Sequence, residues 1–116
     1  MPNKKTGSRF VRYLELCQKA DAKSDRPHPL SLELLNRIAV ADFADQPLHV
    51  TALMAMQDIA SPATIHRKMR ELIDLEWIDA VPLTDNRRVK YLRLTSKAML
   101  FYRQREKLML PAIIER

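Results

Sequence analysis

Residues 51–95 read TALMAMQDIASPATIHRKMRELIDLEWIDAVPLTDNRRVKYLRLT and contain the clearest structural signals of the chain. A short helical pattern ends at Asp58. A second helix opens at Ser61, whose hydroxyl can cap free backbone amides ahead of a proline suited to the first helical position. Two runs rich in β-branched and apolar residues, 78–83 and 89–94, then flank a polar tip. This order predicts a helix-turn-helix followed by a β-hairpin.

The second of these helices should run to about Glu76 and present two chemically different sides. At about 100° per residue, its apolar residues form one stripe that we expect to be buried: Ile65, Met69, Leu72 and Ile73. The opposite side carries Ala63, Arg67, Arg70 and Asp74, with His66 on the flank. A small alanine would allow close approach to a DNA groove, and the arginines could donate paired hydrogen bonds to guanine or contact phosphates. A solvated charged face is the alternative interpretation.

The hairpin predicts a second basic surface. Asp85 and Asn86 suit its turn because both tolerate left-handed conformations, and Pro82 predicts an exposed edge or a break in the first strand. Three cations follow in one exposed loop, namely Arg87, Arg88 and Lys90. Their mutual repulsion favours an anionic partner, and the minor groove of A·T tracts concentrates negative potential. Surface solubility is the alternative role for these cations.

Composition limits the class of protein. The chain has 116 residues, of which 47% are hydrophobic and 29% charged, as expected for one soluble globular domain. Its formal net charge of +6 favours a polyanionic partner, either a nucleic acid or an anionic membrane surface. No apolar run approaches the roughly 20 residues that a membrane-spanning helix needs, and the first residues are polar. We therefore expect a cytoplasmic protein without a membrane partner.

The sequence argues against metal and nucleotide chemistry. Cys17 is the only cysteine, so it provides neither an internal disulfide nor a zinc framework. His28, His49 and His66 lie far apart, without acidic or cysteine neighbours at ligand spacing. Gly7 is the only glycine, whereas phosphate-binding loops and dinucleotide fingerprints need several. We expect no catalytic residue, no metal and no cofactor, and hence a protein that is not an enzyme.

Two further helices and a strand are predicted before the second helix of the central segment. An amphipathic first helix is indicated by the spacing of Phe10, Tyr13, Leu14, Cys17 and Ala20. Residues 23–29 contain two prolines and predict a linker. Ser31 should cap a helix with Leu34, Leu35, Ile38 and Ala41 on its apolar side, and Pro47 should end it. A short strand at 48–50 would then lead to Thr51, which is expected to cap a short helix through Met56.

A C-terminal helix is predicted after Thr95. Its apolar residues recur at helical spacing: Ala98, Met99, Phe101, Tyr102, Leu108 and Met109. Together with the first helix, it offers more apolar surface than the small central module can cover. We therefore expect an arm, helix and linker used for dimerisation at 1–29, a helix-turn-helix with hairpin at 30–96, and a dimerisation helix at 97–116. The alternative is that both terminal helices fold back on their own domain.

Four segments carry a resemblance to a known family: Ser61 through Leu72, Trp77 and Ile78 to Pro82, Asp85-Asn86-Arg87, and Leu92-Arg93-Leu94-Thr95. Together they resemble the winged helix of the multiple-antibiotic-resistance regulator (MarR) family. The most specific element is the pattern Asp-x-Arg followed by a strand that ends in Leu-Thr. The resemblance covers the middle and later part of the chain, and Glu76 stands where the family usually has glycine.

The resemblance implies a fold and a role for named residues. The fold is mainly α with a small β-wing, a winged helix-turn-helix with extra N- and C-terminal helices. The recognition helix would contact the major groove through Ser61, Ala63, Thr64, His66, Arg67 and Arg70. The wing would contribute Asp85, Arg87, Arg88 and Lys90, with Arg87 entering the minor groove and Asp85 helping to hold the wing. Pairing through the terminal helices would give a homodimer with recognition helices roughly 34 Å apart.

The expected function is that of a transcriptional regulator that binds double-stranded DNA sequence-specifically, as a repressor that blocks its site by occupancy. A small-molecule effector stays open. The alternative is a winged-helix adaptor that binds another protein without specific DNA readout. Cys17 has a peroxide-sensing interpretation, but an inert core cysteine is favoured because reactive thiols need polar or cationic neighbours. Trp77 is expected to anchor the core rather than stack on bases.

Overall fold

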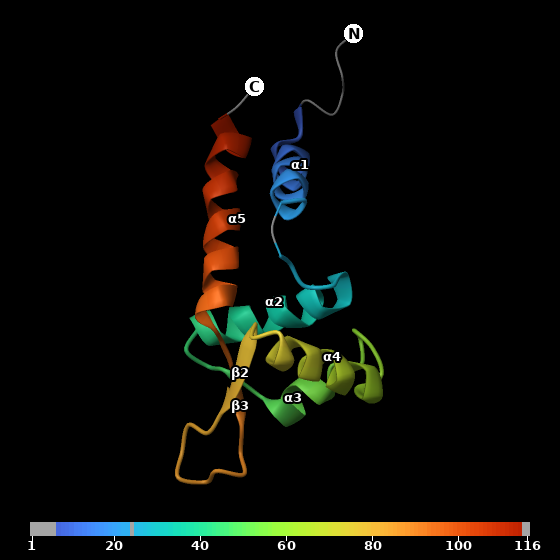
Figure 1. Cartoon of the computed structure of the whole chain (residues 1–116), viewed down its shortest axis with the longest axis vertical. Coiled ribbons are helices and arrows are strands. Elements are labelled where there is room, and N and C mark those ends of the chain that lie inside the picture. The colour runs from blue at the N-terminus through green and yellow to red at the C-terminus, as the bar shows by residue number, and fades with distance from the viewer. Residues whose placement is uncertain (1–6, 24, 115–116) are drawn as a thin grey trace. The chain divides into compact units, whose positions relative to one another are not determined.

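The computed structural model describes residues 7–23 and 25–114 and contains helices with one small sheet (Figure 1). The elements in chain order are α1 (Arg9–Asp21), α2 (Pro29–Phe43), β1 (Leu48–His49), α3 (Val50–Met54), α4 (Pro62–Asp74), β2 (Ile78–Val81), β3 (Tyr91–Leu94) and α5 (Ser96–Ile114). The prediction of a mainly α protein with a small β element is confirmed. Residues 1–6 of the expected N-terminal arm and the last two residues of the expected C-terminal helix lie outside the described part.

The chain divides into two compact units. One consists of Met1–Arg26 together with Leu100–Arg116, and the other is Pro27–Met99. The division falls inside α5, so that helix contributes its first turn to the second unit and its remainder to the first. We call the first of these the terminal unit and the second the central unit.

The central unit has a core to which α2, α3, α4, β2 and β3 contribute buried side chains. Its largest fully buried side chains are Leu34, Leu35, Ile38, Leu53, Ile65, Leu72, Trp77, Ile78 and Leu92. Helix α2 packs against both α4 and β3, and α3 packs against α4. Burial of these apolar side chains, at about 25 cal/mol per Å², is the main force that holds the three helices on the sheet.

Helix α2 begins and ends earlier than predicted. Its N-cap is His28, whose Nδ1 accepts a hydrogen bond from the Leu30 N–H at 3.2 Å. The expected cap, Ser31, is instead a buried residue inside the helix. The helix can begin at Pro29 because a first-turn proline needs no amide partner. It ends at Phe43, well before Pro47, and Asp45 then adopts a left-handed conformation with φ of 58°.

The cap of α3 also differs from the prediction. The backbone N–H of Thr51 donates to Nδ1 of His49 at 3.0 Å, so Thr51 is a donor inside the first turn and not the cap. The helix starts at Val50 because β1 ends at His49, and it ends at Met54 instead of Met56. The short strand expected at 48–50 is present at its first two residues.

The opening of α4 is confirmed. Ser61 caps it through its hydroxyl, which accepts from the Thr64 N–H at 3.3 Å, and Pro62 occupies the first turn. The helix ends at Asp74, two residues before the predicted end. Glu76 then has φ of 65°, in the left-handed region that favours glycine. This turn directs the chain into β2, because the next residue, Trp77, donates its N–H back to Leu72 at 2.9 Å.

The sheet is antiparallel, with strand order β1-β3-β2. β2 pairs with β3 from Ile78↔Leu94 to Val81↔Tyr91, and β1 pairs with β3 through Leu48↔Leu92 and His49↔Tyr91. The two hairpin strands are shorter than the predicted runs at 78–83 and 89–94. Pro82 ends β2 because it has no N–H to donate to the ladder.

The terminal unit contains α1 and the part of α5 from Leu100. The carboxylate of Asp21 accepts two hydrogen bonds from Arg105, both at 3.0 Å, and the Arg105 guanidinium lies 4.2 Å from the centroid of Phe101. Cys17 is buried, as expected for a core cysteine. Burial and a hydrogen bond with Cys17 raise the pKa of Tyr13 to about 12. Among residues 7–23 and 25–114, no helix is both long and apolar enough to cross a membrane.

Candidate nucleic-acid interface

Helix α4 has the two-sided character that its sequence predicts. Ile65 and Leu72 are fully buried, Met69 is buried, and Ile73 is half-buried. The residues expected on the opposite side are all exposed: Ala63, His66, Arg67, Arg70 and Asp74. Because the apolar stripe is fixed in the core, the orientation of the exposed side is fixed with it.

The first turn of α4 is stiffened by its two hydroxyl residues. Besides accepting from the Thr64 N–H, the Ser61 hydroxyl donates to Oγ1 of Thr64 at 3.1 Å. Both predicted contact residues therefore have their hydroxyls engaged in capping the helix. In this arrangement the two side chains hold the start of α4 in place.

The cations of α4 differ in how they are used. Lys68 is largely covered, with 16% of its side chain exposed, and pairs with Glu71 at 3.5 Å. In the described part of the chain, Arg67 and Arg70 form neither an ion pair nor a side-chain hydrogen bond. Each guanidinium therefore retains all of its N–H donors for a partner outside the chain.

The loop between β2 and β3, residues 82–90, extends from the end of the sheet that lies away from α2 (Figure 1). We call it the hairpin loop. Residues 83–88 are all exposed, and so both Arg87 and Arg88 face solvent, whereas Lys90 is half-buried. The hairpin loop and α4 both belong to the central unit.

Thr84 and Asn86 organise the hairpin loop. Oγ1 of Thr84 accepts from the Asn86 N–H at 3.2 Å, and Oδ1 of Asn86 accepts from the Arg88 N–H at 3.1 Å. The carbonyl of Asn86 also accepts from the Val89 N–H at 3.2 Å. Asp85, to which the resemblance gives a holding role, is exposed and contributes no side-chain hydrogen bond or ion pair within the described ranges. The side chains that hold this loop are those of Thr84 and Asn86.

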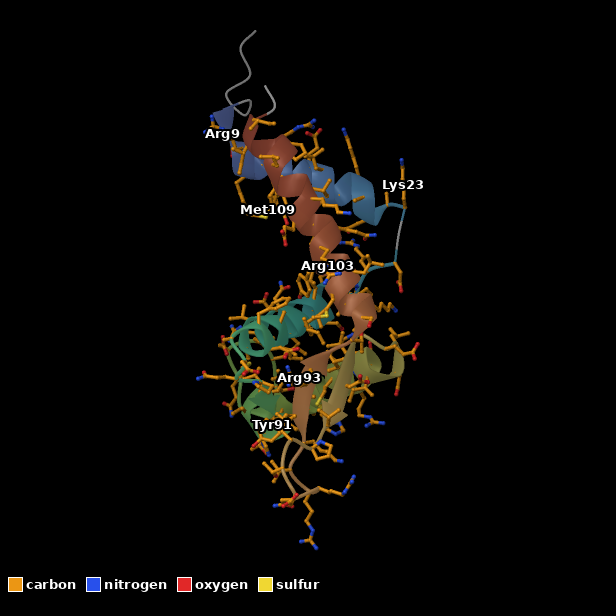
Figure 2. The ribbon with its side chains drawn as sticks, turned by 90° about the vertical axis from the view of Figure 1, so that its left-hand side faces the viewer. Arg9, Lys23, Tyr91, Arg93, Arg103 and Met109 are labelled. Atoms are coloured by element: carbon orange, nitrogen blue, oxygen red, sulfur yellow. The ribbon has the colours of Figure 1, made fainter. Side chains whose placement is uncertain are left out.

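An ion pair that the sequence did not indicate fixes β3 to α2. Arg93 donates from Nε to Oδ1 of Asp42 at 2.9 Å, and the Leu94 N–H donates to Oδ2 of the same carboxylate at 2.9 Å. Only 8% of the Asp42 side chain is exposed. Figure 2 shows Arg93 and Tyr91 on β3, the strand that continues from the hairpin loop. Arg93 is thus committed to the fold.

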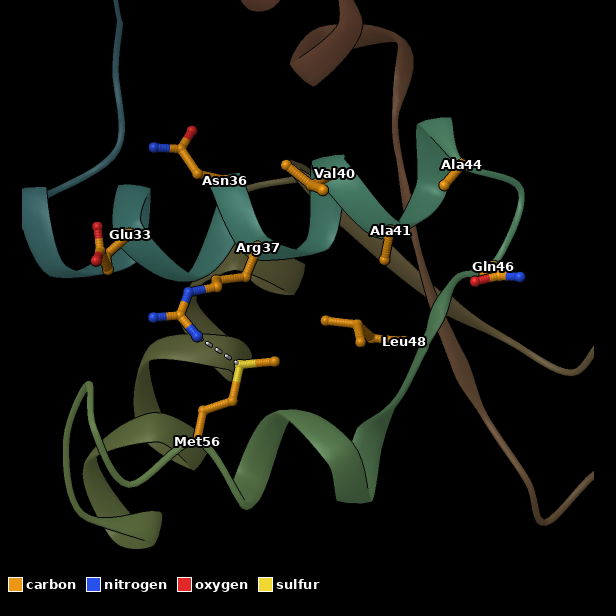
Figure 3. Close-up of a pocket in the computed structure, with 9 residues that line it drawn as sticks. All are labelled: Glu33, Asn36, Arg37, Val40, Ala41, Ala44, Gln46, Leu48 and Met56. Atoms are coloured by element: carbon orange, nitrogen blue, oxygen red, sulfur yellow. Dashed lines mark hydrogen bonds between the residues drawn. The ribbon is translucent and has the colours of Figure 1, made fainter.

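A second ion pair connects α2 with the segment that precedes α4. Arg37 donates from Nη2 to Oδ2 of Asp58 at 2.7 Å, and its Nη1 lies 3.9 Å from Sδ of Met56 (Figure 3). The hydrogen bond from Arg37 lowers the pKa of Asp58, and Asp58 in turn raises the pKa of Arg37. A groove of about 550 Å³ lies beside this pair, lined by Glu33, Asn36, Arg37, Val40, Ala41, Ala44, Gln46, Leu48 and Met56.

Trp77 packs in the core, as predicted. It is 2% exposed, and the Lys97 ammonium lies 4.3 Å from the centroid of its ring. Lys97 also donates to the carbonyl of Leu75 at 2.8 Å, which stabilises the turn after α4. A base cannot stack on an indole that is covered in this way.

No cluster of three or more histidine, cysteine or acidic residues that could hold a metal ion occurs among residues 7–23 and 25–114. The chain matches no protein-family model and has no significant match among curated proteins. The candidate site therefore rests on the structure alone. It consists of two exposed arginines on α4 and two on the hairpin loop of the same unit.

Proposed function

We propose that the chain is a winged helix-turn-helix transcriptional regulator, of the kind that its resemblance to the MarR family implies, and that it represses by occupying a double-stranded DNA site. The observation that carries this proposal is that the central unit exposes two sets of arginines whose guanidinium groups have no partner among the described residues: Arg67 with Arg70 on α4, and Arg87 with Arg88 on the hairpin loop. Unpaired guanidinium groups in one compact unit suit a polyanion, because phosphates neutralise several of them together.

In this proposal, α4 is the recognition helix and enters the major groove. Ala63 provides the close approach, and Arg67 and Arg70 donate bidentate hydrogen bonds to guanine or contact phosphates. A correct bidentate contact contributes about 1 to 3 kcal/mol of discrimination against a wrong base. The burial of Ile65 and Leu72 supports this role, because base readout needs a helix whose orientation is fixed.

The hairpin loop is the proposed wing. Arg87 enters the minor groove, where narrow A·T tracts attract an inserted arginine. The hydrogen bonds of Asn86 support this role because they shape the backbone directly around Arg87. Arg88 and Lys90 contribute sequence-independent attraction to the flanking phosphates.

A homodimer is proposed for the terminal unit. Large apolar side chains are exposed on α1 at Phe10, Val11 and Leu14, and on α5 at Leu100, Met109, Leu110, Ile113 and Ile114. Many exposed large apolar side chains on the two helices of one unit suit a protein interface. Two-fold pairing through these helices would set two copies of α4 roughly one duplex turn, about 34 Å, apart on a pseudo-palindromic site.

Selection from a random duplex library with the full-length protein tests this function. We expect enrichment of a two-fold symmetric site whose binding weakens steeply as salt rises. A single, asymmetric enriched half-site would overturn the dimeric arrangement. If no sequence is enriched above the input library, the proposal of specific DNA readout fails.

One observation favours a second candidate, a protein adaptor without specific DNA readout. Val40, which lines the groove together with Leu48 and Met56, is 73% exposed, and Phe43 on the same helix is 64% exposed. An exposed aromatic and aliphatic pair next to an apolar groove suits a protein partner. Duplex retention at moderate salt separates the candidates, because the adaptor predicts weak binding that is equal for all sequences.

A further inference from the structure

His49 joins the start of α3 to the base of the hairpin. It ends β1 and is paired in register with Tyr91 of β3, and the neighbouring Val50 N–H donates to the carbonyl of Lys90 at 3.2 Å. The imidazole also meets the Tyr91 ring edge to face, with centroids 5.6 Å apart and an interplanar angle of 82°. One residue therefore contacts the strand that returns from the proposed wing and the helix that packs against α4.

The same imidazole caps α3 in a way that depends on its protonation. Nδ1 of His49 accepts from the Thr51 N–H at 3.0 Å, so this nitrogen must carry no proton while the cap is made. Protonation would turn the acceptor into a donor and leave a backbone amide of the first turn without its partner. It would also place a positive charge at the end of the helix where the dipole is already positive.

The surroundings of His49 do not offset such a charge. On β3 and directly before it, the ionisable residues are Lys90, Tyr91 and Arg93, and α3 has none. The ionisable residues of α2, which also packs against β1, are Glu33, Arg37 and Asp42. Asp42 is paired with Arg93, and Arg37 with Asp58. Lys90, the residue directly before Tyr91 in the chain, is a cation and would repel a protonated His49.

We infer that His49 is a positioning residue for the proposed DNA interface, which holds the start of α3 and the base of the wing in register only while its imidazole is neutral. This inference rests on the proposed function. The direction of the pH dependence follows from the cap. The hydrogen bond from the Thr51 N–H to His49 is present at higher pH and is lost as the pH falls and His49 gains a proton. Sequence-specific binding should then decrease in acid, although the added positive charge favours phosphate attraction in general.

Two measurements at about pH 7.5 and about pH 5.5, within the range where histidine serves as a switch, test this inference on the full-length protein. The first is hydrogen exchange of the Thr51 amide without DNA. The second is the ratio of affinities for the duplex enriched by selection and for a scrambled duplex, at constant ionic strength. In the wild type we expect a lower protection factor for the Thr51 amide in acid, that is, weaker protection after correction for the intrinsic slowing of amide exchange as pH falls. We also expect a loss of up to about tenfold in the affinity ratio.

Variants of His49 separate the effect of its hydrogen bond with the Thr51 N–H from the effect of its ring contact with Tyr91. His49→Asn retains a strong N-cap acceptor that does not titrate here, so its affinity ratio should be the same at both pH values. His49→Phe retains an aromatic ring against Tyr91 but no acceptor, so its ratio should be low at both. An acid-induced loss in His49→Asn as large as that of the wild type would overturn the inference, as would a wild-type ratio in His49→Phe at about pH 7.5.

The other histidines provide two controls. His28→Asn replaces the equivalent cap of α2 and should retain the acid-induced loss of the wild type, because His28 does not join α3 to β3. His66 lies on the proposed contact side of α4, so His66→Asn is compared only in the protection of the Thr51 amide, which acid should still lower. If His28→Asn abolishes the acid-induced loss, or if His66→Asn abolishes the change in Thr51 protection, the inference fails. If the wild type prefers no duplex at either pH, the proposed function fails, while Thr51 exchange still decides whether the cap is acid-sensitive.

Discussion

Helix α4 and the hairpin loop both expose a pair of arginines, but they are held in place by different forces. The position of α4 is set by Ile65, Met69 and Leu72, which are buried in the core of the central unit. The hairpin loop has no buried residue from 83 to 88 and is shaped by the hydrogen bonds of Thr84 and Asn86. A rigid helix suits directional hydrogen bonds to base edges, whereas a loop of this kind suits electrostatic attraction, which tolerates movement.

The largest expected difference between the two regions is in stability. Leu72→Ala removes a side chain that is 1% exposed, and it should lower the free energy of unfolding of the chain by about 2 to 5 kcal/mol. Arg88→Ala, on the exposed loop, should change it by less than about 0.5 kcal/mol. Urea denaturation followed by circular dichroism measures both. Equal destabilisation by the two variants would contradict the assignment of α4 to the core and the loop to the surface.

The next largest effect is the loss of DNA sequence specificity expected when an arginine of α4 is replaced. Arg67→Ala or Arg70→Ala should reduce discrimination between the selected duplex and its single-base-pair variants by about 1 to 3 kcal/mol where that arginine reads a base. Lys68→Ala is the matched control, because Lys68 is paired with Glu71 on the same helix. Fluorescence anisotropy titrations provide the affinities. If Arg67→Ala and Arg70→Ala weaken all duplexes equally, these residues contact phosphates and base readout lies elsewhere.

A smaller effect is expected from loosening the hairpin loop. Asn86→Ala removes the acceptor for the Arg88 N–H, a hydrogen bond that contributes about 0.5 to 1.5 kcal/mol. Amide exchange at Arg88 should become faster, and affinity for A·T-rich flanks should decrease. Asp85→Ala is the control, since this exposed neighbour has no side-chain partner in the described residues. Slow exchange retained in Asn86→Ala would show that the loop is held in another way.

The smallest expected change follows from Arg87→Ala. Loss of one cation at the DNA should reduce the dependence of log affinity on log salt concentration by about 0.9 and weaken binding most at A·T-rich flanks. Arg88→Ala should reduce the salt dependence in a similar way without changing the flank preference. Titrations at several salt concentrations on duplexes with A·T-rich and G·C-rich flanks measure both quantities. An unchanged flank preference in Arg87→Ala would exclude its minor-groove role.

Local signals made the two-sided helix predictable. The hydroxyl of Ser61, the proline after it and the spacing of Ile65 and Leu72 all lie within one helix, and the structure confirms their placement. The hairpin strands were predicted to be too long, because runs of β-branched residues do not show where pairing stops. Pro82 provided the physical reason for the end of β2, since it lacks an N–H.

The contacts that lie outside α4 and the hairpin loop but support the candidate interface could not be predicted in the same way. The Asp42–Arg93 pair joins residues 51 positions apart, and no spacing rule connects them. The histidine caps were missed because Ser31 and Thr51 are the more usual cap residues. His49 becomes the cap only because β1 pairs with β3 up to that residue, which depends on strand register rather than on local sequence.

The most direct test of the proposed interface is a titration of the full-length protein with the selected duplex, followed by nuclear magnetic resonance at the backbone amides. If α4 and the hairpin loop contact one duplex, the amides around Arg67 and Arg70 and those around Arg87 should shift together and saturate at the same DNA concentration. Shifts confined to α2 around Val40 and Phe43, or to only one of the two regions, would contradict a shared DNA-binding surface.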